Sequence, residues 1–547
     1  MVFPENLSDK SWSRDRWGII CPMNSIMRKI AILFVITGIL LSSCSPNLWG
    51  TYDTTPTVPS TAAVTVFTDP QPSPTDLVLP FSTVQSTAIP PSPTVTTTPT
   101  IPAVTPGTPR ASFIYSSQSG DSLEAVALHF GVSVSKISST VNLPKAGLLN
   151  PGTPLIIPNR VSQIHTTPST KIIPDCELVY SPCDQGFNIE QFVNTAGGYL
   201  STFHEPLGNV VITGSEGIKR IAFGSSIGPR MLLALIQYYS GWVQGAPNQG
   251  VDKSYPLGYQ NPLYIGLYQQ LRLVVQDLLA GYYGWRDGTL IGLTFPDGST
   301  LRLDPTLNAG TVALQYLFSK RLSYNEWLQA IDPNAGFPSL FAGMFGDPWV
   351  QAQETGPLFP PDMTQPNFTL PFEVGAPWTL TGGPHPAWEQ ESALAALDFA
   401  PAMDAPGCGV SNAWVVAVAP GLIVRSEDGY VVLDLDQDGF EQTGWVFLYE
   451  HIAAKDRIPV NTVVNAGDHI GHPSCEGGTA TGTHVHVARK YNGEWVAAGD
   501  PLPFILSGWT AHAGSAPYQG TLTKGNLVVT ASQVSLGSSK IIRQPGQ

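Results

Sequence analysis

Residues 51–110 are the feature that most limits how this chain can fold. Of these 60 residues, 17 are Thr, 13 are Pro and 5 are Ser, and only a few are charged. Such a segment lacks the apolar side chains that a core needs, and its prolines favour extended conformations. We therefore predict a disordered linker over residues 44–110, followed by the folded parts of the chain.

The length and charge of the chain narrow its class further. At roughly 100–200 residues per domain, 547 residues predict about three or four units. The formal net charge of −14 disfavours a nucleic acid as partner, because a polyanion would be repelled. The 13 Trp, 22 Phe and 18 Tyr residues are enough to build sizeable cores. These values argue against a basic DNA-binding protein and a polytopic membrane protein.

A short apolar run near the N-terminus predicts export. Arg28-Lys29 precede residues 30–41, which are too few to span a bilayer but suit the core of a signal peptide. The run ends in L-S-S-C, with the cysteine at position 44, and this resembles the lipobox of bacterial lipoproteins. The resemblance implies removal of residues 1–43, lipidation of Cys44 and a membrane-anchored lipoprotein on the extracellular face of the cell envelope. An ordinary signal peptide with a chance cysteine is the alternative.

Four cysteines remain in the part of the chain that would be exported. Cys176 and Cys183 are close enough to pair locally within a second linker, 161–183. Cys408 and Cys475 flank one candidate domain and could pair across it. An exported location favours disulfides, and four cysteines allow three pairings.

Residues 111–160 predict a small module with a strand, two helices and a returning strand. Asp121 or Ser122 is placed to cap the first helix, whose apolar residues recur at helical spacing until Gly131. The sequences G-D-S-L, F-G-V-S and P-G-T-P-L-I-I-P resemble the LysM domain. The resemblance implies a βααβ fold that binds N-acetylglucosamine-containing glycans, chiefly peptidoglycan or chitin. It also implies a sugar groove lined by Gly120, Asp121, Ser122 and Leu123. A module of this fold without a ligand is the alternative.

Residues 184–360 predict a helical domain, with its clearest helix over 229–242. This helix resembles the opening of the lytic transglycosylases, in which the helix ends in Glu-Ser-Gly. Here the tripeptide is Tyr239-Ser240-Gly241, and tyrosine is a poor acid for a glycosidic oxygen near neutral pH. We expect a lysozyme-like fold that binds glycan without cutting it. An unrelated helical spacer, or glycan cleavage by another acid of this domain, is the alternative.

From residue 371 the chain changes to short β-type runs separated by Gly, Asn and Asp turns, which predicts an antiparallel sheet. His484 and His486 stand two apart in G-T-H-V-H, so on a strand both side chains face one groove. Asp398 lies between apolar neighbours and needs a partner or a metal. His385, Asp398 and one of the paired histidines would supply three ligands to Zn²⁺ and leave a position for water.

These segments resemble the lysostaphin-type zinc endopeptidases over about residues 375–505, where A-G-D-H-I-G at 466–471 adds a further mark. The resemblance implies His385, Asp398 and His486 as zinc ligands. It leaves His451 and His484 off the metal, where they would orient water and stabilise the oxyanion.

One departure from this family's pattern concerns the first ligand. Most members place this histidine four residues before the aspartate, where this chain has Leu394. The wider spacing matches the beta-lytic and staphylolysin branch. If that alignment fails, the domain has lost a ligand and is a pseudoenzyme, with His469 or His472 as the next candidates.

Residues 434–439 have the D-x-D-x-D-G spacing of a calcium loop. The twelfth position is Trp445, where an EF-hand has a bidentate Glu. A hairpin loop between two strands explains the same residues.

The sequence thus predicts a multidomain, lipid-anchored cell-wall hydrolase. Its zinc endopeptidase domain, 371–505, would cleave stem-peptide or cross-bridge bonds in peptidoglycan, with residues 506–547 as a tail. The alternative is a non-catalytic wall-binding scaffold or a hydrolase activator.

Overall fold

The computed structural model describes residues 112–158, 160–161, 164–402, 407–534 and 536–546. The predicted signal peptide, the Thr/Pro-rich linker and Cys44 lie outside the described residues. Within the described ranges, no helix combines the length and the apolar character that crossing a membrane requires.

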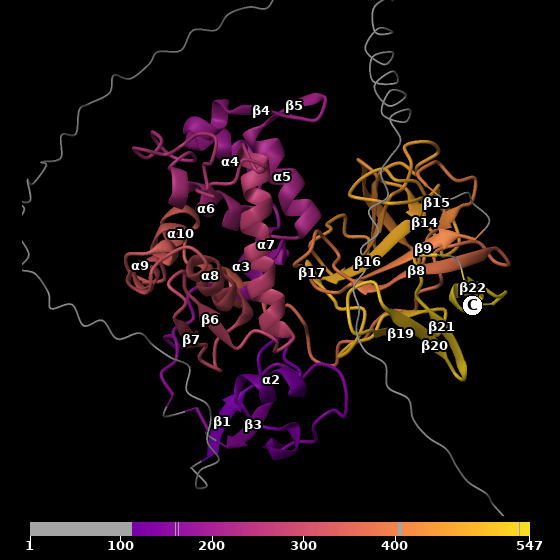
Figure 1. Ribbon diagram of the computed structural model, residues 1–547, viewed down its shortest axis with the longest axis horizontal. Helices are drawn as coiled ribbons and strands as arrows, with labels where there is room; N and C mark the ends of the chain where they lie inside the picture. Colours follow the sequence, from indigo (N-terminus) through magenta and orange to yellow (C-terminus); the bar gives the residue numbers. More distant parts are fainter. Residues whose placement is uncertain (1–111, 159, 162–163, 403–406, 535, 547) are drawn as a thin grey trace, which may run out of the picture. The chain divides into compact units, whose positions relative to one another are not determined.

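The first folded region is a three-stranded antiparallel sheet, in the order β1-β3-β2, packed against one helix (Figure 1). Its elements are β1 (Ser112–Ser116), α2 (Leu123–His129), η1 (Val134–Lys136), β2 (Ser138–Ser139) and β3 (Pro154–Pro158). The hydroxyl of Ser122 caps α2 by accepting the amide N–H of Ala125. The expected second helix is only the three-residue 3₁₀ turn η1, because the chain turns back into β2 directly after it.

The second region is mainly helical, and its long helix α7 runs between α5 and α8 (Figure 1). Its helices are α3 (Asp175–Leu178), η2 (Pro182–Asp184), α4 (Ile189–Ala196), η3 (Tyr199–Thr202), α5 (Gly214–Ser225), α6 (Pro229–Ser240), α7 (Leu267–Arg286), α8 (Ala309–Ser319), α9 (Tyr324–Ala330), α10 (Phe337–Phe345) and α11 (Pro348–Thr355). Two hairpins complete it: β4 (His204–Leu207) with β5 (Val210–Thr213), and β6 (Gly292–Thr294) with β7 (Thr300–Arg302).

Helix α6 is the helix that the sequence predicted most clearly, and it lies in the middle of this region's core. The first eight residues of α6, 229–236, are all buried, and Gly241 ends the helix in the left-handed conformation. The hydroxyl of Tyr239, at the position where the transglycosylase-like pattern would need an acid, is buried, and burial raises its pKa. Tyr239 therefore packs against the core with a buried hydroxyl, and its raised pKa makes it unsuited to proton transfer near neutral pH.

The C-terminal region is built from antiparallel strands, as its turn pattern predicted. Its elements are β8 (Pro377–His385), β9 (Ala396–Pro401), β10 (Val415–Val416), β11 (Gly421–Glu427), β12 (Tyr430–Asp434), β13 (Trp445–Glu450), β14 (Val463–Val464), β15 (His469–Gly471), β16 (Val485–Tyr491), β17 (Glu494–Trp495), β18 (Ile505–Leu506), β19 (Trp509–Ala513), β20 (Gly520–Lys524), β21 (Leu527–Thr530), η4 (Gly537–Ser539) and β22 (Lys540–Ile542). The main sheet has the order β14-β11-β12-β13-β16-β9-β8-β22, with β17 beside β16, and β18 to β21 form a second sheet. Residues 506–547, which we expected as a tail, thus contain strands of both sheets.

The main sheet is buried on both faces. Alternate residues of one strand point to opposite faces, and in β12 Val431 and Leu433 join the inner core of this region. Val432, between them, joins the core of the helical region instead. The helices therefore cover one face of the sheet that carries the candidate site.

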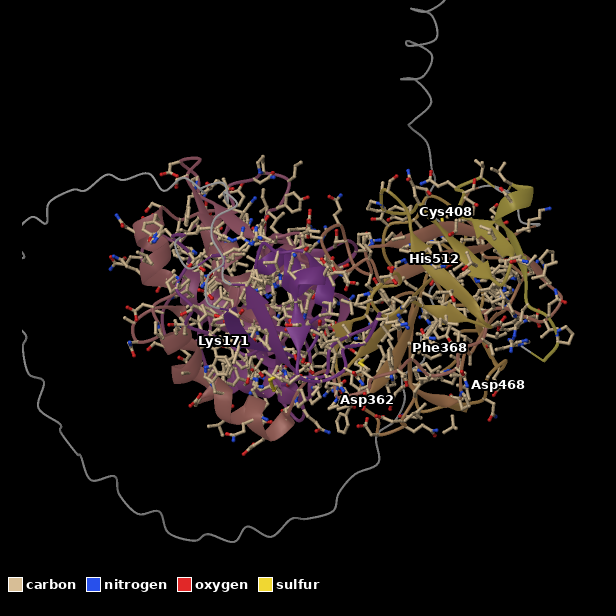
Figure 2. The ribbon with its side chains drawn as sticks, turned by 90° about the horizontal axis from the view of Figure 1, so that it is seen from below. Lys171, Asp362, Phe368, Cys408, Asp468 and His512 are labelled. Atoms are coloured by element: carbon tan, nitrogen blue, oxygen red, sulfur yellow. A yellow bond between two sulfur atoms is a disulfide. The ribbon has the colours of Figure 1, made fainter. Side chains whose placement is uncertain are left out.

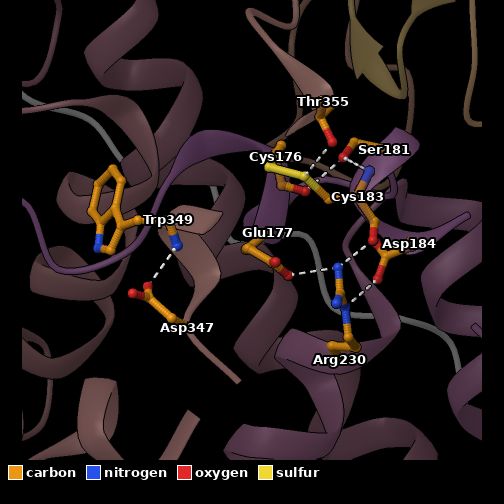
Figure 3. The surroundings of a disulfide bond; sticks show 9 residues. All are labelled: Cys176, Glu177, Ser181, Cys183, Asp184, Arg230, Asp347, Trp349 and Thr355. Carbon is orange, nitrogen blue, oxygen red and sulfur yellow. Dashed lines mark hydrogen bonds and ion pairs between the residues drawn. A yellow bond between two sulfur atoms is a disulfide. The ribbon is translucent and has the colours of Figure 1, made fainter. Parts of the chain in front are cut away.

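A disulfide and a buried ion pair hold the start of the helical region together (Figure 3). Cys176 is bonded to Cys183, one of the two pairings that we expected. The Arg230 guanidinium lies 2.9 Å from the carboxylate of Glu177 and 3.1 Å from that of Asp184. Both carboxyl groups are almost fully buried, so Arg230 compensates two charges that water does not reach.

Replacing Arg230 by alanine should lower the free energy of unfolding by about 3–5 kcal/mol, because both carboxyl groups would stay buried without their partner. Chemical denaturation of the full chain measures this loss. Arg220→Ala is the matched control: it removes part-exposed ion pairs with Glu216 and Asp428 and should cost about 0–1 kcal/mol. Equal losses in the two variants would contradict the role given to Arg230.

The loss in Arg230→Ala should also grow as the pH rises through about 7 to 8, where the parent chain releases protons that the variant still holds. Burial raises the pKa of Glu177 to about 8 and that of Asp184 to about 7, although Arg230 lowers both. Without Arg230 the folded state holds these protons more tightly still, whereas the unfolded chain releases them near pH 4–5. Stability therefore falls as the pH rises through this range.

Candidate metal centre

Three neighbouring strands bring His385, Asp398 and His486 together. His486 on β16 stands opposite Asp398 on β9, and His385 ends β8, the strand on the other side of β9. The pairing of β8 with β9 shifts between Gly382 and His385. His385 and Asp398 therefore lie side by side although they are thirteen residues apart in the sequence. Gly382 leaves room for this, since a Cβ there would lie 2.5 Å from the Asp398 carboxylate.

The donor atoms of these residues are spaced as metal ligands are. Asp398 Oδ1 lies 3.2 Å from His385 Nε2 and 3.3 Å from His486 Nδ1, and the two nitrogens are 3.1 Å apart. A tetrahedral zinc with bonds of about 2.0–2.1 Å places its ligands about 3.3 Å apart. All three side chains are buried, and Asp398 Oδ1 accepts no hydrogen bond of good geometry from the described residues. This set fits a zinc ion.

Charge in the cluster is arranged for metal binding. Burial raises the pKa of Asp398, but the imidazoles of His385, His486 and His484 outweigh it and hold this pKa well below its usual range. The carboxylate is therefore ionised, as a ligand must be. The remaining nitrogen of His385, Nδ1, is 2.8 Å from the carbonyl oxygen of Gly383, which orients the ring.

His451 and His484 lie beside these three residues, with their ring centres 4.4 Å apart. His484 Nε2 is 3.7 Å from Asp398 Oδ1. Nδ1 of His451 is 2.8 Å from the carbonyl of Glu476, and Nδ1 of His484 is 2.7 Å from that of Gly482. A carbonyl only accepts hydrogen bonds, so both rings carry the proton on Nδ1 and leave Nε2 available. Burial also lowers the pKa of His451, which favours its neutral form.

All five residues line one cleft of about 710 Å³. Its described lining comes entirely from residues 379–534, so no side chain of the helical region enters it. Aromatic and polar groups form its walls, among them Trp388, Glu389, Gln390, Tyr430 and Tyr518. A cleft of this size is within the usual range of ligand-binding pockets.

Glu450 is a site residue that the sequence analysis missed. Its Oε1 accepts the amide N–H of Gly478 at 2.8 Å, and its Oε2 lies 4.0 Å from His486 Nε2. That nitrogen is buried and makes no hydrogen bond of good geometry with the described residues. Because β13 pairs with β16 with Glu450 opposite His486, an alignment of these two strands would have indicated it.

Tyr518 is a second residue that the sequence analysis missed. Its ring stacks on His385 with the ring centres 4.2 Å apart. It comes from the turn between β19 and β20, within the segment expected as a tail. No sequence pattern indicates this contact, because it depends on how the second sheet packs beside β8.

The other predicted site residues have structural surroundings. Residues 120–122 of the proposed sugar groove are buried, and Leu123 is half-buried. The Asp121 carboxylate accepts hydrogen bonds from the Tyr115 hydroxyl and the Gln118 amide, both at 2.8 Å. The carbonyl of Ser119 accepts a hydrogen bond from Arg286 of α7. This edge of the module therefore faces the helical region, and its sugar-binding role stays a prediction.

His469 and His472 do not line the described cleft. His469 stacks on Trp414 and contacts Glu373, and His472 is held by the carbonyl of Ala413. Cys408, labelled in Figure 2, is bonded to Cys475, the second expected disulfide.

The carboxylates of Asp434, Asp436 and Asp438 approach one another closely enough for a cation. Asp434, the buried one, already accepts loop amides from Asp436 and Gly439. The loop joins β12 to β13, as the hairpin alternative expected, and calcium binding stays a prediction.

Comparison with known proteins places two parts of the chain. Residues 118–158 match the family model of the LysM domain, which implies peptidoglycan binding, and residues 171–358 match that of the LasA N-terminal domain. The chain is homologous to Protease LasA of Pseudomonas aeruginosa strain PAO1, with 27% identity over 289 residues, and to its counterpart in strain UCBPP-PA14, with 26% identity. Each alignment covers 50% of this chain and 65% of the relative.

Solved structures of M23 peptidases resemble smaller parts of the chain. The metalloprotease pseudoalterin from the deep sea is 21% identical, over 31% of this chain and 96% of its own, with a TM-score of 0.26. The catalytic domain of lysostaphin from Staphylococcus simulans is 21% identical, over 23% and 89%, with a TM-score of 0.17. At such scores the likeness does not identify the function of this chain.

Replacing Glu450 by glutamine should weaken zinc binding by about 10–100-fold, because its carboxylate, 4.0 Å from the outer nitrogen of His486, attracts that N–H and helps to orient the ring. Competition with a chromophoric chelator measures the affinity without any enzyme assay. Glu427→Gln, at an exposed position on β11, is the control and should leave the affinity unchanged. Parent-like affinity in Glu450→Gln would mean that another acceptor, such as the nearby backbone carbonyl of Ala387, holds the ring.

Proposed function

We propose that this chain is an exported zinc endopeptidase that hydrolyses stem-peptide or cross-bridge bonds of peptidoglycan. The observation that carries the proposal is the convergence of three buried donor atoms, all within 3.3 Å of one another, beside two further imidazoles in one cleft. Three protein ligands with a fourth position for water are typical of catalytic zinc sites, whereas structural sites have four protein ligands.

The residues of the cleft divide the work of peptide hydrolysis between them. His385, Asp398 and His486 would hold the zinc, which when bound supplies an acidified water and polarises the scissile carbonyl. His451 and His484 present Nε2 to the cleft with Nδ1–H held by backbone carbonyls. One of these rings would take a proton from the water, donate it as an imidazolium to the oxyanion and pass it on to the leaving amine. The other would accept a hydrogen bond from the same water and orient it.

Peptidoglycan as the substrate is supported by features of the chain other than the cleft. The LysM domain implies peptidoglycan binding, and Protease LasA is a relative that carries the name of a protease. The non-catalytic scaffold alternative depends on the loss of one zinc ligand. His385 Nε2 lies 3.2 Å from Asp398 Oδ1, so the first ligand position is filled and this reason for the scaffold is weaker. Glycan cleavage through the transglycosylase-like acid position is disfavoured, because Tyr239 stands there with its hydroxyl buried and its pKa raised.

Single substitutions should separate metal binding from catalysis. His385→Ala and His486→Ala should lose both zinc and hydrolysis, since each removes a ligand. His451→Ala and His484→Ala should keep one zinc per chain and lose about 10²–10⁴-fold in rate, the usual contribution of a general acid or base. Zinc content by elemental analysis and release of peptide fragments from purified peptidoglycan, identified by mass spectrometry, test both halves.

His512→Ala is the matched control, because His512 lies in the same region on β19, is exposed and bonds only to Thr523 among the contacts described. It should retain zinc and activity. Full zinc occupancy and parent-like hydrolysis in His385→Ala would reject the ligand assignment. If the parent chain binds zinc but hydrolyses no peptidoglycan, the non-catalytic scaffold would be favoured.

We also propose that Cys44 is lipidated and that the LysM domain holds the chain on the wall. The parent chain should partition with membranes in detergent extraction, and Cys44→Ala should be released or remain as a precursor. In the same fractionation, residues 111–160 alone should bind insoluble peptidoglycan. A Cys44→Ala chain that fractionates and migrates like the parent would refute the anchor.

A further inference from the structure

The loop of residues 386–395 joins the strand of His385 to the strand of Asp398, and it packs against the helices. Three of its alanines, at 387, 393 and 395, are buried in the hydrophobic core of the helical region and do not join the inner core of the sheet. The wide spacing between the two ligands therefore provides a segment that reaches the helices. The amide of Ala387 donates to the carbonyl of Ala393 at 3.0 Å, so the loop folds back on itself.

Trp388 connects this loop to helix α5. Its ring packs against the helical core and also lines the cleft. Its backbone amide is held by the Ser392 hydroxyl at 2.8 Å. Gly224 of α5 lies directly against the indole, since a Cβ on Gly224 would be 3.1 Å from Trp388 Nε1. The absence of a side chain at Gly224 allows Trp388 its place in the wall of the cleft.

Glu389 connects the same loop to helix α7. The Arg272 guanidinium donates two hydrogen bonds of 2.9 Å to the two carboxylate oxygens of Glu389. The backbone of Glu389 has a φ of 50°, which residues other than glycine seldom adopt. A half-exposed ion pair contributes little to global stability, but a two-pronged one sets the direction of both side chains.

We propose that helices α5 and α7 set the substrate affinity of the cleft by holding Trp388, Glu389 and Gln390 as one of its walls. This proposal rests on the proposed function and adds a part of the substrate site that the peptidase region does not hold alone. Gly224 and Arg272 are positioning residues, because the described cleft includes no residue of the helices. The wall formed in this way offers a peptide an aromatic face beside carboxylate and amide groups.

Gly224→Leu in the full chain tests the contact with α5. The new side chain should push Trp388 out of its place and raise KM for soluble muropeptides, prepared from peptidoglycan with a muramidase, by roughly tenfold, with kcat within about twofold. Zinc content should stay at the parent level. Gly343→Leu on α10 is the matched control, because nothing lies within 4 Å of a Cβ there, and its KM should not change.

A charge reversal at Arg272 tests the contact with α7 and leaves the residues of the cleft unchanged. Arg272→Glu should raise KM, and Arg272→Lys, which keeps a cation beside Glu389 but loses the two-pronged contact, should raise it less. Parent-like KM in both Gly224→Leu and Arg272→Glu would overturn the proposal. Loss of zinc in either variant would also overturn it, since the helices would then position the metal ligand and not the wall.

A binding measurement keeps this test separate from the proposed activity. Calorimetry with the same muropeptides and the zinc-loaded His484→Ala chain gives Kd without hydrolysis, with and without Gly224→Leu. If the parent chain proves inactive, the proposed function fails, while weaker binding with Gly224→Leu still supports the wall. An equal Kd with and without Gly224→Leu would refute it.

Discussion

The guanidinium of Arg286, at the end of α7, joins all three described regions of the molecule. It lies 2.8 Å from Glu494 of β17 and 3.0 Å from Asp175 of α3, and it donates to the carbonyl of Ser119 in the LysM domain. Its side chain is only 9% exposed, and a charge so far from water is tolerated only with such partners. Losing one partner would leave a charge buried, so the three regions hold one another in place.

The sheet that this contact fixes against the helices also carries the candidate site. His486, Asp398 and His385 come from three adjacent strands, so the positions of their donor atoms follow from strand register. A slip of one residue between β9 and β16 would turn one ligand to the opposite face. Burial of both faces makes such a slip costly, since apolar residues of β12, β13 and β16 pack alternately against helices and inner core.

Besides covering one face of the sheet, the helices also contact a loop that lines the site. The loop between His385 and Asp398 reaches their core through its alanines, and its neighbouring residues face the cleft. The helical region, which matches the LasA N-terminal domain, thus contributes no residue to the described lining of the cleft. It contacts only the loop that forms one of the walls of the cleft. The same helical region faces the predicted sugar groove of the LysM domain. It therefore borders both surfaces proposed to bind peptidoglycan, the sugar groove and the cleft.

Sequence alone determined the features that depend on near neighbours. The spacing of His484 and His486 predicted that both face one groove, and both line the cleft, although His484 stands just before β16. Helix α6 followed from its apolar run, and the turn pattern after residue 371 predicted antiparallel strands. Only the tertiary structure decided whether His385 reaches Asp398, because the shift in β8 makes up for their wide spacing. Glu450, Tyr518 and the strands within residues 506–547 acquire their places through contacts between distant parts of the chain. Such contacts depend on how sheets and helices pack, which periodicity and local motifs do not encode.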